Sequence, residues 1–389
     1  MKILITSDWY APAINGVVTS VLNLEKELTA MGHEVRVLTL SQSPHSLKKG
    51  NVTYIGAVSA GMIYPGARLR TAPAMVLLRE LVAWKPDIIH SQCEFSTFFM
   101  ARKIAGAAGV PLVHTYHTVY EDYTHYFSPS RRWGRAAVAA LTRWVVAQTE
   151  AVIAPTAKVR RLLESYQVER PIFVIPTGID LARFDAPVDA ERLRELRRGL
   201  DIPQEALVLV YVGRLAEEKN LPQLLRHVAA MERDDIRLLL VGDGPYRGAL
   251  EAQVRSMGLE GIVRFAGMVA PAQVADYYRV GDLFVSASAS ETQGLTYLEA
   301  LACGLPALCL RDECLTGVVI DGVNGCQFRD GVEFCRFLER FAGDEHLRRQ
   351  LSRGALETAR REFSARTFAR RAVKLYEQVL LESQGSGAA

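Results

Sequence analysis

The sequence predicts an α/β protein made of two Rossmann-like halves, each with a parallel sheet covered by helices on both faces. Short apolar runs rich in β-branched residues alternate with segments of helical spacing along the 389-residue chain. Strands that alternate with helices are typical of parallel sheets. The alternation starts again after a Pro-Thr-Gly turn at residues 176–178, and the chain is too long for one typical core. We therefore expect two domains.

The first half begins with an apolar strand and a helical segment over residues 18–31, which Gly32 closes as a C-terminal stop. The predicted strands of this half cover residues 2–7, 34–40, 52–55, 88–89, 112–115 and 151–154. These elements define an expected N-terminal domain over residues 1–175.

The second half repeats the pattern, and its predicted strands cover residues 207–212, 237–241, 262–265, 283–285 and 307–310. We expect a C-terminal domain over residues 176–364. Ligands of open parallel sheets bind outside the carboxyl ends of the strands, and pockets favour domain interfaces. The functional site is therefore expected in a cleft between the two halves.

Composition indicates an ordinary soluble protein, with 49% hydrophobic and 23% charged residues. A net charge of +3 is too small to argue for a nucleic-acid partner. No stretch approaches the roughly 20 apolar residues of a membrane span, and the amino terminus lacks a signal-peptide pattern. The cysteines form no CxxC pair and predict reduced thiols. We expect a cytoplasmic protein whose membrane contacts are peripheral.

The stretch FVSASASETQGLTYLEALACG, residues 284–304, predicts a strand, a tight loop and the start of a helix. The backbone amides of Gly294, Leu295 and Thr296 at such a start can hold an anion such as a diphosphate. Glu291 and Glu299 flank this position. Because carboxylates aimed at a phosphate would repel it, we expect them to accept hydrogen bonds from sugar and ribose hydroxyls. For the spacing alone, a surface helix with two acids is the alternative.

The loop VGRLAEEKN, residues 212–220, follows the first strand of the second half. Arg214 and Lys219 on this loop can converge on a diphosphate, the arginine as a two-pronged donor and the lysine as a point charge. In isolation such a motif is more often a solvated loop. The neighbouring pair of glutamates favours the functional interpretation. No Asp-x-Asp occurs and the histidines are scattered, so no metal site is expected.

Two positions of the first half are further candidates. Gly16, in AINGVV, joins the first strand to the first helix, where a glycine lets a ligand approach the backbone. A plain strand-to-helix turn is the alternative. His117, in YHTVYEDYTHY, follows the strand at residues 112–115 and is expected to face the cleft. A structural histidine is the alternative there.

The segment SRRWGRAAVAALTRWVVA, residues 130–147, has helical periodicity. One face carries an apolar stripe, formed by Trp133, Ala137, Leu141 and Trp144. The opposite face carries the arginines Arg131, Arg132, Arg135 and Arg143. Core packing of the stripe and binding of the helix to an anionic membrane surface both stay open.

These motifs together resemble the retaining glycosyltransferases of the GT-B fold, in family 4. The Glu-x7-Glu pattern followed by EALACGLPAL carries the resemblance. It implies that Glu291 contacts the transferred sugar and that Glu299 contacts the ribose of the nucleotide. It also implies that Arg214 and Lys219 bind the leaving diphosphate.

In the first half, the resemblance implies that the loop at Gly16 closes on the donor and that His117 lies against the transferred sugar. It further implies that the last helix, within residues 365–389, returns to the N-terminal domain.

Within the family, YHTVYEDYTHY and ETQGLTYLEAL resemble the bacterial 1,2-diacylglycerol 3-glucosyltransferases. Gln293 and Thr177 replace the Phe and Asn of many relatives and point to this lipid branch. The resemblance implies a UDP-glucose donor as co-substrate, no other cofactor and no essential metal, and front-face transfer that retains the α configuration. The implied acceptor is diacylglycerol, reached at the inner face of the cell membrane, with the apolar-then-basic loop at residues 61–68 admitting an acyl chain.

Two other functions stay open. One is a retaining galactosyl- or mannosyltransferase that acts on another lipid or a soluble acceptor. The other is a nucleotide-sugar-binding protein without catalysis.

Overall fold

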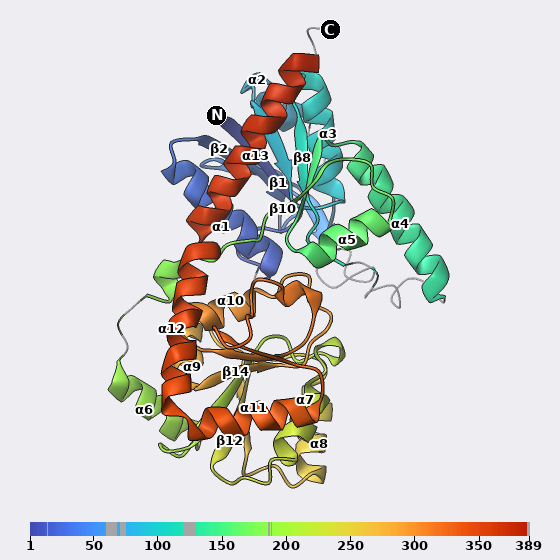
Figure 1. The fold of residues 1–389 in the computed structure, drawn as a ribbon. Coiled ribbons are helices and arrows are strands. Elements are labelled where there is room, and N and C mark those ends of the chain that lie inside the picture. The colour runs from blue at the N-terminus through green and yellow to red at the C-terminus, as the bar shows by residue number, and fades with distance from the viewer. Residues whose placement is uncertain are drawn as a thin grey trace. The chain divides into compact units, whose positions relative to one another are not determined.

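The computed structural model describes residues 1–13, 15–59, 68–70, 75–119, 121, 130–185, 187 and 189–386. Most of the loop expected to admit an acyl chain, residues 61–67, and residues 120 and 122–126 of the tyrosine-rich segment lie outside the described residues. The chain divides into two compact units (Figure 1): unit 1 is Met1–Gly178 with Ala365–Ala389, and unit 2 is Ile179–Ser364.

Unit 1 contains an eight-stranded sheet. Its strands are β1 (Lys2–Ser7), β2 (Glu34–Leu40), β3 (Leu47–Lys49), β4 (Val52–Ile55), β7 (Ile88–Ser91), β8 (Leu112–Thr115), β9 (Ala151–Ala154) and β10 (Ile172–Val174). The strand order is β10-β9-β8-β7-β1-β2-β4-β3, with only the β3–β4 pairing antiparallel. The chain builds outward from β1 on one side and then returns to its other side at β7. The strand order therefore reverses between β1 and β7, which is where ligands of such sheets bind.

Helices cover both faces of this sheet because successive residues of a buried strand point to opposite sides. Ile3 packs with α1 and α13 on one face, and Leu4 packs with α2 and α3 on the other. Figure 1 shows α13, in red, lying along α1. The helices of unit 1 are α1 (Gly16–Ala30), α2 (Met75–Ala83), α3 (Ser96–Ala108), α4 (Arg131–Ala147), α5 (Ala157–Ser165) and α13 (Ala365–Ser386). A separate antiparallel hairpin joins β5 (Ala57–Ser59) and β6 (Arg68–Arg70).

Unit 2 contains a six-stranded, wholly parallel sheet. Its strands are β11 (Leu207–Val212), β12 (Ile236–Val241), β13 (Val263–Gly267), β14 (Leu283–Ser286), β15 (Ala307–Leu310) and β16 (Gly325–Phe328). The order β13-β12-β11-β14-β15-β16 reverses between β11 and β14. Unit 2 therefore has the same kind of strand-order reversal as unit 1. We call the position of such a reversal the switch point of the unit.

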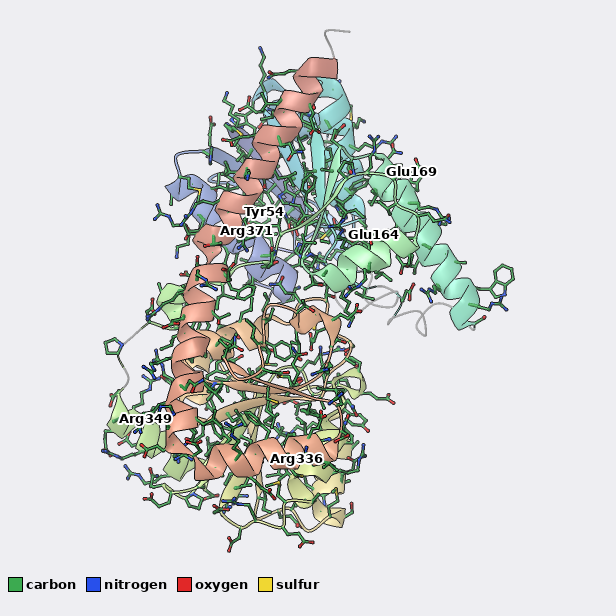
Figure 2. All side chains as sticks on the ribbon, in the orientation of Figure 1. Tyr54, Glu164, Glu169, Arg336, Arg349 and Arg371 are labelled. Atoms are coloured by element: carbon green, nitrogen blue, oxygen red, sulfur yellow. The ribbon has the colours of Figure 1, made fainter. Side chains whose placement is uncertain are left out.

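The helices of unit 2 divide between the two faces of its sheet. Val210 packs in the hydrophobic cluster that includes α10, and Leu209 packs in the cluster that includes α7 and α11. Charged side chains on the outer faces of these helices are exposed, as Arg336 on α11 and Arg349 on α12 illustrate (Figure 2). The helices are α6 (Ala190–Gly199), α7 (Leu221–Ala229), α8 (Arg247–Ser256), α9 (Val274–Val280), α10 (Leu295–Ala302), α11 (Gly331–Gly343) and α12 (Glu345–Glu362).

The predicted fold class is confirmed, because both units are α/β layers around parallel sheets. The six cysteines are all free thiols, as predicted. In the part of the chain that the structure describes, no helix is both long and apolar enough to cross a membrane.

The core-packing interpretation of the apolar stripe on α4 is wrong. Trp133, Leu141 and Trp144 are 78%, 44% and 40% exposed. The helix packs on unit 1 through a neighbouring face of small and β-branched side chains, namely Gly134, Val138, Thr142, Val145 and Val146. Periodicity located an apolar face on this helix, but it did not show that a second face, rich in valine, makes the contact with the sheet.

Candidate functional site

The switch point of unit 2 brings together the two loops that carry the predicted donor-binding residues. The loop of residues 213–220 follows β11, and the loop of residues 287–294 follows β14. The side-chain amide of Asn220 donates to the carbonyl of Ala287 at 3.3 Å, and the hydroxyl of Ser290 donates to the carbonyl of Glu218 at 3.0 Å. These bonds tie the loops to each other, so residues far apart in the sequence share one site.

Lys219 and Glu291 form an ion pair within this site. Lys219 Nζ lies 2.6 Å from Glu291 Oε1, and their side chains are only 19% and 18% exposed. Arg214 contacts a different carboxylate, because its guanidinium lies 2.6 Å from Glu218 Oε1 and is 47% exposed. The structure thus places both predicted cations on one loop, with Lys219 the more enclosed of the two.

The start of α10 forms the floor of this site. Gly294 has a φ of +72°, and a Cβ added there would lie 2.3 Å from the ring of Tyr297, so only glycine fits. The first N–H groups of the helix, including those of Leu295 and Thr296, have no acceptor within the helix itself. Together with the positive end of the helix dipole, they form an arrangement suited to a phosphate.

Glu299 lies in the second turn of α10. Its Oε2 accepts a hydrogen bond from the hydroxyl of Tyr278 at 2.9 Å, which fixes the carboxylate in one orientation. Burial raises the pKa of Glu299, and the Tyr278 hydrogen bond and the charge of Arg183 partly oppose that rise.

A third loop, which follows β12, packs directly against the loop of residues 213–220. A Cβ on Gly242 would lie 2.0 Å from the carbonyl oxygen of Gly213, and one on Gly244 would lie 2.3 Å from that of Leu215. Both glycines are therefore required by backbone packing at the edge of the site.

In unit 1, Gly16 is the first residue of α1. The preceding Asn15 caps this helix, because its side chain accepts a hydrogen bond from the N–H of Val18 at 2.9 Å. Gly16 is exposed at the carboxyl end of β1. The geometry suits both a ligand contact and a plain capped turn.

His117 follows β8 and belongs to a chain of hydrogen bonds. Its Nε2 lies 2.6 Å from Gln92 Oε1, and Gln92 Nε2 lies 3.0 Å from His90 Nε2. His90 Nδ1 lies 2.6 Å from the hydroxyl of Tyr376 on α13. Burial lowers the pKa of His117 to about 4, against the opposing charge of Glu94. The imidazole of His117 is therefore neutral at pH 7.

Two acids that follow strands of unit 1 were missed in the sequence. Asp8 accepts hydrogen bonds from the N–H groups of Ser96 and Thr97 at 3.2 and 2.7 Å, and burial raises its pKa to about 6. Glu94 lies 3.4 Å from His114, and both are buried. Each acid follows the apolar run of a strand at its carboxyl end, and that position was the available signal. Across the described ranges, no group of three or more His, Cys, Asp or Glu side chains is arranged to hold a metal ion.

Two family models match the chain. The one described as Glycosyltransferase Family 4 matches residues 14–183, and the one described as Glycosyl transferases group 1 matches residues 193–358.

Curated relatives cover most of the chain. The alpha-monoglucosyldiacylglycerol synthase of Streptococcus pneumoniae is 35% identical over 338 residues, which is 84% of this chain and 75% of the relative. The protein of the same name from Acholeplasma laidlawii is 30% identical over 390 residues, covering 97% of this chain and 96% of the relative.

The fold is similar to that of solved glycosyltransferases with the GT-B architecture. The structure of Anabaena Alr3699/HepE in complex with UDP superposes with a TM-score of 0.76 at 18% identity, over 97% of this chain and 100% of that one.

The lowered pKa of His117 predicts a specific dependence of stability on pH. Its folded-state pKa of about 4 lies below the ordinary value of 6.5. Between these values the unfolded chain binds a proton that the folded chain excludes. The free energy of unfolding should fall as the pH drops through this window, by about 2 kcal/mol at pH 5 from this residue alone.

Urea denaturation at pH 7 and pH 5 measures the effect. The variant His117→Gln should lose about this much of the pH dependence, whereas His45→Gln, a change at an exposed histidine, should not. The same pH dependence in wild type and His117→Gln would contradict the prediction.

Proposed function

The chain belongs to glycosyltransferase family 4, and on that premise we propose that it moves glucose from UDP-glucose onto the 3-hydroxyl of 1,2-diacylglycerol. The product is an α-glucosyl diacylglycerol with the configuration of the donor retained. The two relatives that span most of the chain, both named alpha-monoglucosyldiacylglycerol synthase, support this acceptor.

The observation that carries the transferase chemistry is the meeting of Lys219, Glu291 and the start of α10 at one switch point. A glycoside hydrolase needs two carboxylates but has no use for cations and helix amides that bind a diphosphate. The UDP named in the similar Anabaena structure supports a uridine donor.

In the proposed reaction the bond between the anomeric carbon and the diphosphate oxygen breaks, and the acceptor oxygen bonds to the same face of that carbon. The hydroxyl proton passes to the departing diphosphate. Lys219, Arg214 and the amides of Leu295 and Thr296 stabilise the negative charge on the leaving group. Charge-assisted hydrogen bonds of this kind contribute about 1.5–3 kcal/mol each. No metal is required in this scheme.

In the ion pair of Lys219 with Glu291, the diphosphate of the bound donor can replace the carboxylate as the partner of the ammonium group. When a diphosphate takes the ammonium group as a partner, the carboxylate of Glu291 is released toward the hydroxyls of the transferred sugar. Glu299, already oriented by Tyr278, accepts from the ribose hydroxyls. His117 contacts the transferred sugar.

The exposed stripe of α4 is the proposed contact with an anionic membrane surface. The ring of Trp144 lies 5.5 Å from that of Phe99 on α3, tilted by 38°, and Phe99 is 53% exposed. The guanidinium of Arg102 lies over the Trp144 ring at 5.7 Å. Trp133 is the most exposed aromatic side chain of this helix. Aromatic rings beside cations suit the boundary between acyl chains and headgroups. Under this proposal the protein acts at the cytoplasmic face of the cell membrane.

Product analysis tests the reaction directly. The purified protein is incubated with diacylglycerol vesicles and a panel of UDP- and GDP-hexoses, with and without EDTA. We expect a mass-spectrometric product only with UDP-glucose, an α anomeric proton by NMR, and the same yield in EDTA. A product from another sugar or acceptor would overturn the assignment of substrates, and loss of activity in EDTA that Mg²⁺ restores would overturn the metal-free scheme.

Glu299→Ala should weaken binding of the nucleotide sugar by about tenfold or more, because the ribose hydroxyls lose a charged acceptor. Titration calorimetry with UDP-glucose measures this. Glu345→Ala, at an exposed glutamate of α12, is the matched control and should bind as wild type does. Unchanged affinity in a folded Glu299→Ala protein would remove the ribose role.

Trp133→Glu with Leu141→Glu should reduce sedimentation with anionic vesicles by about tenfold or more, since each buried apolar side chain contributes about 1.5–3 kcal/mol. Turnover of vesicle-borne diacylglycerol should fall with it, while turnover of a short-chain soluble analogue should not. Leu381→Glu, at a 71% exposed leucine of the same unit, is the control. Equal losses on both substrates would contradict a membrane role for α4.

A further inference from the structure

A buried row of polar side chains leads from α13 to His117 in unit 1. Tyr376, His90 and Gln92 are at most 1% exposed, and each lies within hydrogen-bond distance of the next. Burying polar groups is costly unless their bonds are satisfied, so such a row is held in place by its own pairing. The reaction scheme above assigns no role to these three side chains.

With the side-chain amide of Gln92 oriented as in the structure, the position of each proton in this row follows. Gln92 Oε1 can only accept, so the bond of 2.6 Å to His117 requires the proton on His117 Nε2. The amide nitrogen of Gln92 can only donate, so His90 must accept at Nε2, 3.0 Å away. The neutral His90 then carries its proton on Nδ1 and donates it to the oxygen of Tyr376 at 2.6 Å. The hydroxyl of Thr115 also lies 2.7 Å from Nε2 of His90 and, with this tautomer, shares the single lone pair of that nitrogen with the amide of Gln92.

The row has one alternative arrangement, in which the proton of each histidine is on its other ring nitrogen. If His90 carried its proton on Nε2, that N–H would face the N–H of Gln92. The side-chain amide of Gln92 would then have to flip, so that its oxygen and nitrogen exchange positions. His117 Nε2 would then face a donor and would have to accept, with its proton on Nδ1. Because an amide has one oxygen side and one nitrogen side, the proton positions of His90 and His117 are coupled.

We propose that Tyr376, His90 and Gln92 are positioning residues that hold His117 as the neutral tautomer with its proton on Nε2. This leaves Nδ1 of His117 as the atom that accepts a hydrogen bond from a substrate hydroxyl. The inference rests on the proposed function, in which His117 contacts the transferred sugar. The opposite tautomer would offer a donor at Nδ1 and lose that bond.

Tyr376→Phe tests the proposal because it removes one oxygen and keeps the ring. Without that oxygen, His90 loses its acceptor at Nδ1 and moves its proton to Nε2, where Thr115 can accept it. The coupling then predicts that the proton of His117 moves from Nε2 to Nδ1. Two-bond proton–nitrogen correlation spectra of histidine-labelled protein distinguish the two tautomers, and His117→Gln assigns the signals.

Tyr166→Phe is the matched control, since it also removes a tyrosine hydroxyl from a hydrogen bond in unit 1, the 2.6 Å bond to Glu121, but outside this row. It should leave the His117 signals unchanged. Gln92→Met breaks the row in the middle and should leave His117 as a mixture of both tautomers. This second variant keeps the test decisive if Tyr376→Phe does not fold.

Activity with UDP-glucose completes the test. We expect kcat/KM to fall about tenfold in Tyr376→Phe, as for one lost hydrogen bond. A His117 proton that stays on Nε2 would overturn the coupling. A moved proton with unchanged kcat/KM would overturn the positioning role. Failure of the proposed function is a separate result, namely a wild-type protein without transferase activity whatever the tautomer of His117.

Discussion

The reversal of strand order beside the first strand of each unit is the constraint on which both candidate sites depend. Crossovers leave such a reversal toward opposite faces of the sheet, so space remains at the carboxyl ends of the two strands, where both loops begin. In unit 2, the loops after β11 and β14 meet there and bring Lys219 to Glu291. In unit 1, Gln92 follows β7, one of the two strands at the reversal, and its side chain reaches His117, which follows the neighbouring β8. In both units, polar side chains that would be costly in a core without partners are paired with one another at the carboxyl ends of the strands.

The energetics of the Lys219–Glu291 pair suit a binding site better than a structural support. A pair that is largely withdrawn from water loses much of its attraction to the cost of desolvation, so it adds little net stability. Its charges are nevertheless held in place and poorly hydrated. A diphosphate that displaces the carboxylate therefore meets a cation with little water to remove, while the start of α10 supplies neutral donors nearby. In the proposed reaction this arrangement performs the charge neutralisation for which other enzymes use a bound cation.

The sequence predicted the features that depend on residues close together in the chain, and it missed those that depend on residues far apart. The predicted strands at residues 2–7 and 207–212 coincide with β1 and β11, because long, buried, β-branched runs have few alternatives. β10 was missed because it is a short edge strand whose residues are only partly buried. Lys219 and Glu291 were predicted as site residues from local motifs. The His90–Tyr376 contact joins residues 286 positions apart, and no local pattern contains it.

The α4 helix shows why an amphipathic pattern alone did not settle its role. The helix has a valine-rich face against unit 1 and a tryptophan-bearing face that stays exposed. The ring of Trp144 lies against that of Phe99 on α3, and the two side chains stay 40% and 53% exposed. In the proposed membrane contact, acyl chains would bury the exposed aromatic area, and the arginines beside it would face anionic headgroups. An anionic lipid surface meets both requirements, and a lipid acceptor for the proposed transfer would be presented at that same surface.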